Sequence, residues 1–111
     1  MPENRQNKDI VSKINDIERN YFSNPQVQNI LKTLKDETRQ LLFILLMINE
    51  KLTLKQLSDL LNKGKTTVHH HIKRLEERRI VMWEEKEADK KTLKTRYYSL
   101  NYDLLNSIFG V

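Results

Sequence analysis

The side chains best suited to polar recognition lie together after Gly64. The run 65–79 carries hydroxyl, imidazole, ammonium and guanidinium groups, and Val68, Ile72 and Leu75 recur within it at helical spacing. This spacing predicts an amphipathic helix whose apolar stripe packs inward while its polar groups point outward. Such groups hydrogen-bond to base edges and phosphates, and an α-helix fits the major groove of DNA. We therefore expect helix 65–79 to bind double-stranded DNA in the major groove.

The predicted DNA contacts fall into three groups by position. Outward residues in the early turns of the helix are expected to reach base edges: Thr66, His69, His70 and Lys73. Two further outward residues of the helix, Lys65 and Thr67, are expected to position phosphates. Arg74 is also expected to contact DNA. Basic residues of a wing, 84–96, are expected to touch the backbone or the minor groove: Lys86, Lys90, Lys91, Lys94 and Arg96.

Three consecutive histidines, 69–71, suggest a metal site at first reading. Neighbouring helical side chains point about 100° apart, so three of them cannot converge on one ion. We therefore expect no metal and no other cofactor. His71 falls beside the apolar stripe, where a packed, hydrogen-bonded histidine is expected instead of a DNA contact.

The excess positive charge lies in the same part of the sequence. The chain has 20 Lys and Arg against 15 Asp and Glu, and segment 63–96 holds 11 of the basic residues and 6 of the acidic ones. The rest balances at 9 against 9. This distribution favours a face that approaches a polyanion. Acidic residues such as Glu84 and Glu85 dilute the charge of the wing, so a merely solvated loop is the alternative there.

Composition argues against several other functions. The 111 residues include no cysteine, which excludes disulfides, thiolate nucleophiles and cysteine metal sites. No motif pairs a nucleophile with a base and no glycine-rich phosphate loop occurs, so we expect no enzyme. The longest apolar run, 41–48, is shorter than the roughly 18 residues of a membrane span, and the start lacks a signal pattern. We expect a cytoplasmic protein without membrane contact.

Helices are predicted ahead of the DNA-binding helix. Asn24-Pro25 separates a helix over 7–22 from a second over about 25–35. Asp36 is expected to cap a third helix, in which the run 41–48 is apolar almost all round and so predicts a central position. Thr53 is expected to cap a fourth helix. That helix carries four leucines on one side, Leu54, Leu57, Leu60 and Leu61, before a turn at 62–64.

Strand-like runs follow the DNA-binding helix. Segments 80–83 and 95–100 are rich in β-branched and aromatic residues and are separated by a polar stretch, which predicts a hairpin. Trp83, Tyr97 and Tyr98 are expected to pack within it. A short helix is predicted over 102–111. The expected fold class is mainly α with a small β-hairpin wing, a winged helix-turn-helix in the order α-α-α-α-β-β-α.

Three stretches resemble the ArsR-type winged helix-turn-helix repressors. Asp36-Glu37-Thr38-Arg39 is similar to that family's D-P-T-R, with Glu37 in place of proline. Leu57 to Leu61 and Thr66 to Leu75 are similar to L-A-x-x-L and S-T-V-S-H-H-L-K-x-L, with Ser58 for alanine, and Tyr97 to Leu100 resembles the second wing strand. The resemblance implies a DNA-binding transcription regulator, with Arg39 as a further phosphate contact or a simple surface arginine. The metal-sensing cysteines and histidines of many members are absent, so the effector stays unknown.

The two ends of the chain carry apolar stripes that a small monomer can hardly cover, which predicts a homodimer. The expected dimerisation residues are Ile10, Ile14, Ile17, Tyr21, Leu105, Ile108 and Phe109. We expect three parts: an N-terminal arm over 1–22, the winged helix-turn-helix over 23–101 and a C-terminal helix over 102–111. The predicted function is a sequence-specific, dimeric repressor; the alternative is a winged-helix module that binds proteins and not DNA.

Overall fold

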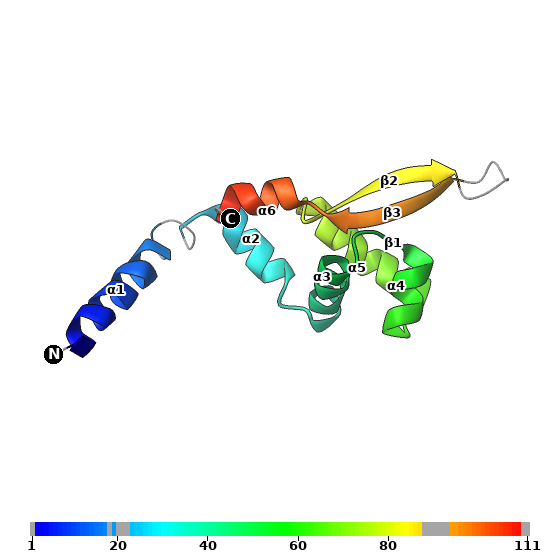
Figure 1. Ribbon diagram of the computed structural model, residues 1–111. Helices are drawn as coiled ribbons and strands as arrows, with labels where there is room; N and C mark the ends of the chain where they lie inside the picture. The colour runs from blue at the N-terminus through cyan, green and yellow to red at the C-terminus, as the bar shows by residue number, and fades with distance from the viewer. Residues whose placement is uncertain (1, 18, 20–22, 88–93, 110–111) are drawn as a thin grey trace.

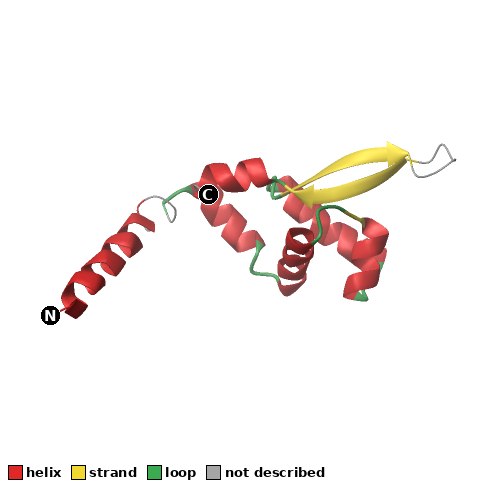
Figure 2. Cartoon of the chain, viewed as in Figure 1, coloured by secondary structure: helices red, strands yellow, loops and turns green. Residues whose placement is uncertain are grey.

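The computed structural model describes residues 2–17, 19, 23–87 and 94–109. Figure 1 shows the elements along the chain, and Figure 2 shows how helices dominate. They are α1 (Pro2–Ile17), α2 (Pro25–Thr33), α3 (Glu37–Ile48), β1 (Leu52–Thr53), α4 (Leu54–Leu61), α5 (Lys65–Glu77), β2 (Val81–Glu87), β3 (Lys94–Leu100) and α6 (Tyr102–Phe109). The predicted fold class is confirmed. The predicted order differs in one helix, because five helices and not four precede the hairpin in the described part of the chain. In addition, α1 begins five residues before the predicted helix, β2 extends four residues beyond the predicted strand 80–83, and β1 was not predicted.

The starts predicted for α2, α3 and α4 are confirmed by their caps. The side chain of Asn24 accepts a hydrogen bond from the backbone N–H of Gln26 at 2.9 Å, and Pro25 occupies the first helical position. Asp36 accepts from the N–H of Arg39 at 3.1 Å. Thr53 and Gln56 form a reciprocal capping box at the start of α4. Side chains thus satisfy backbone donors that each first turn leaves unpaired.

Helices α4 and α5 end alike, each with a non-glycine residue in the left-handed region. Asn62 has φ 53° and Arg79 has φ 61°. At the end of α5, the backbone N–H of Arg79 donates to the backbone oxygen of Glu76 at 2.8 Å. The N–H of Ile80 donates to the backbone oxygen of Leu75 at 3.0 Å. This pair of bonds is a Schellman motif, in which glycine is the usual left-handed residue. The turn predicted at 62–64 is present, and Asn62 is a residue type that tolerates the left-handed conformation.

The strands form one antiparallel sheet in the order β1-β3-β2. Tyr98 lies in the middle, paired with Leu52 of β1 and with Trp83 of β2. It is buried, whereas Trp83 retains about 36% of its surface exposed. The predicted hairpin packing therefore holds for Tyr98 more fully than for Trp83.

The core lies between α2, α3, α4, α5 and the sheet. The three predicted stripe residues of α5, Val68, Ile72 and Leu75, are completely buried in it. Leu57 is buried as well, with Leu54 and Leu61 packed against the core. The fourth leucine of α4 was predicted wrongly, because Leu60 points outward and is 57% exposed.

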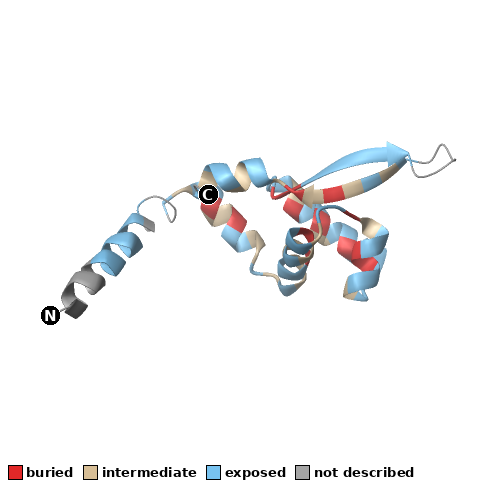
Figure 3. Ribbon diagram, in the orientation of Figure 1, coloured by how far each residue is buried: buried red, intermediate tan, exposed pale blue. Residues whose placement is uncertain are grey.

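Helix α3 is not central, so that prediction was wrong. Its inner side buries Leu42 and Leu46 completely, yet Leu41, Ile44 and Ile48 on the other side are exposed (Figure 3). The elements packed against α3 are α4, α5 and β3, which lie on its inner side. A domain this small has too few elements to surround a helix. Although α3 is apolar almost all round, the described residues cover only one of its faces.

Candidate nucleic-acid interface

Helix α5 presents a polar face to solvent while its other side is held in the core. All seven residues predicted to contact DNA from this helix are exposed: Lys65, Thr66, Thr67, His69, His70, Lys73 and Arg74. The four predicted to reach base edges are Thr66, His69, His70 and Lys73. At about 100° per residue these four fall within a sector of roughly 100°, on the side away from Val68, Ile72 and Leu75. Helix α5 is therefore held in the core by one side and presents one polar face to solvent.

A polar cluster on the inner edge of α5 fixes this helix to α3. The Nη1 of Arg39 lies 3.2 Å from Nδ1 of His71, and its Nε donates to the backbone oxygen of Thr33 at 2.6 Å. Because a guanidinium only donates, Nδ1 accepts and His71 carries its proton on Nε2. The prediction of a packed, hydrogen-bonded histidine is confirmed. Arg39 is not a simple surface arginine, since it is partly buried in this cluster.

The same cluster sets the protonation of its members. Burial lowers the pKa of His71, and the charge of Arg39 acts in the same direction, while the carboxylate of Asp36, 3.7 Å away, opposes both. The backbone N–H of Arg39 lowers the pKa of Asp36. A neutral imidazole between a guanidinium and a carboxylate results. The cluster therefore favours the deprotonated histidine that its hydrogen bond requires.

The wing is attached to α5 and stiffened by stacking. Nε1 of Trp83 donates to the carboxylate of Glu76 at 2.6 Å, which joins β2 to the helix. The guanidinium of Arg96 lies 3.9 Å from the centre of the Trp83 ring and its Nε lies 3.6 Å from Glu85. A hydrogen bond with the Tyr98 side chain, more than that with Glu85, raises the pKa of Arg96. Arg96 thus holds the hairpin together, and any DNA contact it makes is additional.

A groove lies between the recognition helix and the wing. It has a volume of about 510 Å³ and joins residues from β1, α4, α5 and β3: Thr53, Leu54, Lys55, His69, Lys94, Thr95, Arg96 and Tyr98. The cations Lys55, Lys94 and Arg96 border it beside His69. Lys55 was missed by sequence reasoning, because its proximity to β3 depends on the strand pairing of Thr53 with Tyr97.

Some predicted contacts are engaged elsewhere or lie outside the described residues. Arg74 approaches Glu77 at 3.4 Å, and Lys86 lies 3.6 Å from Glu84. Lys94 is exposed at the start of β3. The predictions for Lys90 and Lys91 fall outside the described residues.

The predicted dimerisation residues differ in how exposed their side chains are. Ile10 and Ile14 are exposed on α1, which projects from the body of the molecule (Figure 1). Leu105 and Ile108 are partly buried against the core of their own chain, whereas Phe109 is 37% exposed. The side chain of Ile17 and all of Tyr21 lie outside the described residues.

Helix α4, its turn, helix α5 and the hairpin make up a winged helix-turn-helix, the architecture of a class of DNA-binding transcription regulators. Residues 36–82 match the family model described as bacterial regulatory protein, arsR family. This part of the chain is thus similar to the helix-turn-helix of the ArsR family, and the resemblance found in the sequence is confirmed.

Several solved structures are similar to this chain. The transcriptional regulator HlyU from Vibrio vulnificus CMCP6 is 26% identical with a TM-score of 0.55, over 87% of this chain and 98% of that one. HlyU from Vibrio cholerae N16961 is 22% identical with a TM-score of 0.58, over 78% and 94%. NolR from Sinorhizobium fredii is 18% identical with a TM-score of 0.54, over 77% and 78%. The last two likenesses show the fold alone.

Comparison with curated proteins gives no match. The fold and the family match over residues 36–82 are typical of transcription regulators and support a DNA-binding regulator. Within the described ranges, no three or more His, Asp or Glu residues are grouped so as to hold a metal ion. In the same ranges, none of the helices has the length and apolar character needed to cross a bilayer.

Proposed function

We propose that this protein is a sequence-specific regulator that reads the major groove of double-stranded DNA with α5 and touches the backbone or minor groove with the wing 84–96. The observation that carries the proposal is the seating of α5. Three fully buried side chains fix its inner side, while hydroxyl, imidazole and ammonium groups cover its outer side. Such a rod can enter a groove roughly 12 Å wide without losing its own packing.

The charges around α5 support a division between base and backbone contacts. Thr66, His69 and His70 are short and face outward, so they suit base edges. Lys55, Lys65 and Lys94 surround that face and suit phosphates, whose contacts set register without reading sequence. Lys90 and Lys91 belong to the proposed backbone contacts on sequence grounds alone.

The proposal includes a homodimer that acts as a repressor. One recognition helix covers few base pairs, so a two-fold pair would double the contact on a palindromic site. The exposed stripes of α1 and the outer side of α6 suit such a pair through Ile10, Ile14 and Phe109. Sedimentation at micromolar concentration tests this, and a single 13.3 kDa species would remove the dimer. A reporter gene with the selected site over its promoter tests repression against activation.

A titration of duplex DNA across a salt series, after selection of the preferred site, tests the groove contacts. Counterion release predicts a linear fall of log affinity with log salt, of slope about 0.9 per phosphate contacted. Lys94→Gln should reduce that slope by about 0.9 for every sequence alike. His70→Ala should instead weaken preference at one base position by about 1–3 kcal/mol. Lys32→Gln, on the exposed end of α2, removes an equal charge and should change neither quantity.

Two outcomes would contradict the proposal. Negligible binding of any duplex at moderate salt would favour the protein-interaction module instead. Equal effects of Lys94→Gln and His70→Ala on all sequences would show that the base and backbone contacts are wrongly divided.

A further inference from the structure

The polar cluster between α3 and α5 contains one atom that two partners compete for. Nδ1 of His71 accepts a hydrogen bond from Nη1 of Arg39 at 3.2 Å. The same nitrogen is where the neutral ring takes up a proton, because Nε2 already carries one. A protonated Nδ1 can only donate, and a guanidinium cannot accept, so protonation breaks this bond. The proton and Arg39 therefore exclude each other at Nδ1.

A second partner is available to the protonated ring. Oδ1 of Asp36 lies 3.7 Å from Nδ1 of His71, and it accepts the capping bond from the backbone N–H of Arg39 at 3.1 Å. A movement of less than about 1 Å would bring Nδ1 and this carboxylate within hydrogen-bond distance. A carboxylate accepts several hydrogen bonds, so Asp36 can pair with His71 and still cap α3. The cluster thus has two discrete arrangements, with Arg39 donating to His71 or His71 donating to Asp36.

Charged and titratable groups face His71 from α3, from α5 and from the turn before α5. They are Asp36 and Arg39 at the start of α3, His70 on α5 and Lys63 in the turn. Burial lowers the pKa of His71, the carboxylate of Asp36 raises it, and the positive charges of the other groups lower it further. The side chain is 16% exposed, so a proton can reach it from solvent. The ring is therefore neutral at pH 7 and becomes protonated in acid.

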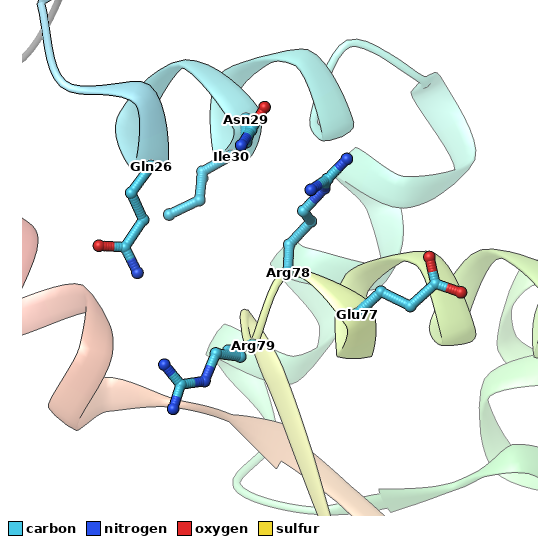
Figure 4. A pocket seen from close by; sticks show the side chains of 6 residues that line it. All are labelled: Gln26, Asn29, Ile30, Glu77, Arg78 and Arg79. Atoms are coloured by element: carbon cyan, nitrogen blue, oxygen red, sulfur yellow. The ribbon is translucent and has the colours of Figure 1, made fainter.

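The end of α5 beyond His71 has room to move. A cleft of about 250 Å³ lies between α2 and the last residues of α5, and it is lined by Gln26, Asn29, Ile30, Glu77, Arg78 and Arg79. Figure 4 shows Arg78 extending toward α2 and Arg79 extending on the side of α6. Helix α2 therefore does not pack closely along this end of α5, and the bond between Arg39 and His71 is one of the contacts that fix the helix.

We propose that Arg39 positions the recognition helix α5 through His71, and that a proton on Nδ1 of His71 replaces Arg39 by Asp36 and so weakens sequence-specific DNA binding. This regulation rests on the proposed function. His70, a proposed base contact, is the next residue on the helix, so a shift of His71 toward Asp36 displaces it as well. Hydrogen bonds to bases depend steeply on distance and angle, whereas phosphate contacts carry no sequence information. The loss therefore falls on preference among sequences.

Nuclear magnetic resonance of the ¹⁵N-labelled full chain tests the exchange of partners without DNA. At neutral pH the Nδ1 signal of His71 should be that of an unprotonated ring nitrogen, and it should titrate with a midpoint below 6.5. The guanidinium signals of Arg39 should change with the same midpoint. Asp36→Asn keeps a good cap but removes the carboxylate, so it should lower the midpoint. Asp103→Asn removes an equal charge from the first turn of α6 and should leave the midpoint unchanged.

DNA binding tests the consequence. The readout is the ratio of the affinities for the preferred site and for an unrelated duplex, between about pH 5 and about pH 8. His71→Asn offers Arg39 a carboxamide oxygen that binds no proton, and it retains any contribution of His69 and His70. In acid the wild-type ratio should fall about tenfold more than that of His71→Asn, the effect of one lost hydrogen bond to a charged group.

Two further variants test the positioning role in the same assay. Arg39→Lys keeps the charge but lacks the fork that reaches both Thr33 and His71, so its ratio should be reduced at every pH. In Asp36→Asn the fall of the ratio should move to lower pH together with the midpoint measured by NMR. This second variant keeps the test valid if His71→Asn folds poorly.

Three results would overturn the inference. They are a neutral ring with its proton on Nδ1, Arg39 signals that stay constant while His71 titrates, and an equal fall of the ratio in the wild type and in His71→Asn. If no duplex binds at any pH although the NMR signals change as expected, the DNA-binding function fails while the exchange of partners stands. The two failures are therefore distinguishable.

Discussion

Replacing Arg79 with glycine should stabilise the fold although it deletes a whole side chain. An L-residue in the left-handed region costs roughly 1–2 kcal/mol, and Arg79 has φ 61°. Glycine removes this cost but makes the unfolded chain freer by about 0.4–1 kcal/mol. No hydrogen bond is lost, because the Schellman bonds and the bond from Asn101 use only the backbone of Arg79. The net gain in the free energy of unfolding should be about 0.5–1 kcal/mol.

Thermal and urea unfolding followed by circular dichroism would measure this gain. For a chain of this size it corresponds to a rise in Tm of roughly 2–4 °C. Arg79→Ala removes the same side chain but keeps a Cβ at positive φ, so it should bring no gain. Asn62→Gly changes the equivalent position of α4, where asparagine already tolerates the conformation, and should be nearly neutral.

The comparison among these three variants decides the matter. If Arg79→Ala stabilises as much as Arg79→Gly, the gain comes from relieving charge repulsion and not from the backbone. If Arg79→Gly destabilises the protein, the guanidinium makes a stabilising contact and the strain reasoning is wrong.

Three further predictions concern the seating of α5 and the wing. Ile72→Ala empties a fully buried position and should lower the free energy of unfolding by about 2–5 kcal/mol in urea titrations, so a loss below 1 kcal/mol would contradict the core assignment. Burial lowers the pKa of His71, so as pH falls below 6.5 the unfolded chain binds this proton more readily than the folded chain. The free energy of unfolding should therefore fall with pH in this range, and His71→Gln should reduce the fall. Trp83→Phe keeps a ring for Arg96 but deletes the donor to Glu76, so hydrogen exchange in β2 should become faster, with a stability loss below about 1 kcal/mol.

Local signals in the sequence were enough to predict most helices. Asn24, Asp36 and Thr53 stand before apolar periodic runs, and each caps a helix in the structure. These caps act within three residues of themselves, so sequence spacing contains the necessary information. Strand β1 could not be predicted this way, because two residues become a strand only through pairing with Tyr97 and Tyr98, far along the chain.

The candidate site also combines features that follow from local sequence with features that depend on the assembled fold. Helical periodicity was enough to predict the exposure of the outward residues of α5 and the position of His71 beside the apolar stripe. The stack of Arg96 on Trp83 and the approach of Lys55 to the groove depend on how strands and helices meet. The exposed face of α3 was missed because periodicity cannot say how many neighbours a small domain provides.

The two ends of α5 border different regions of the surface. Its first turns border the groove shared with the wing, and its last residues border the cleft shared with α2. Between them, Val68, Ile72 and Leu75 are completely buried in the core. Close-packed side chains cannot absorb a displacement gradually, so a shift imposed at one end of α5 has to move the other end or the elements packed on it.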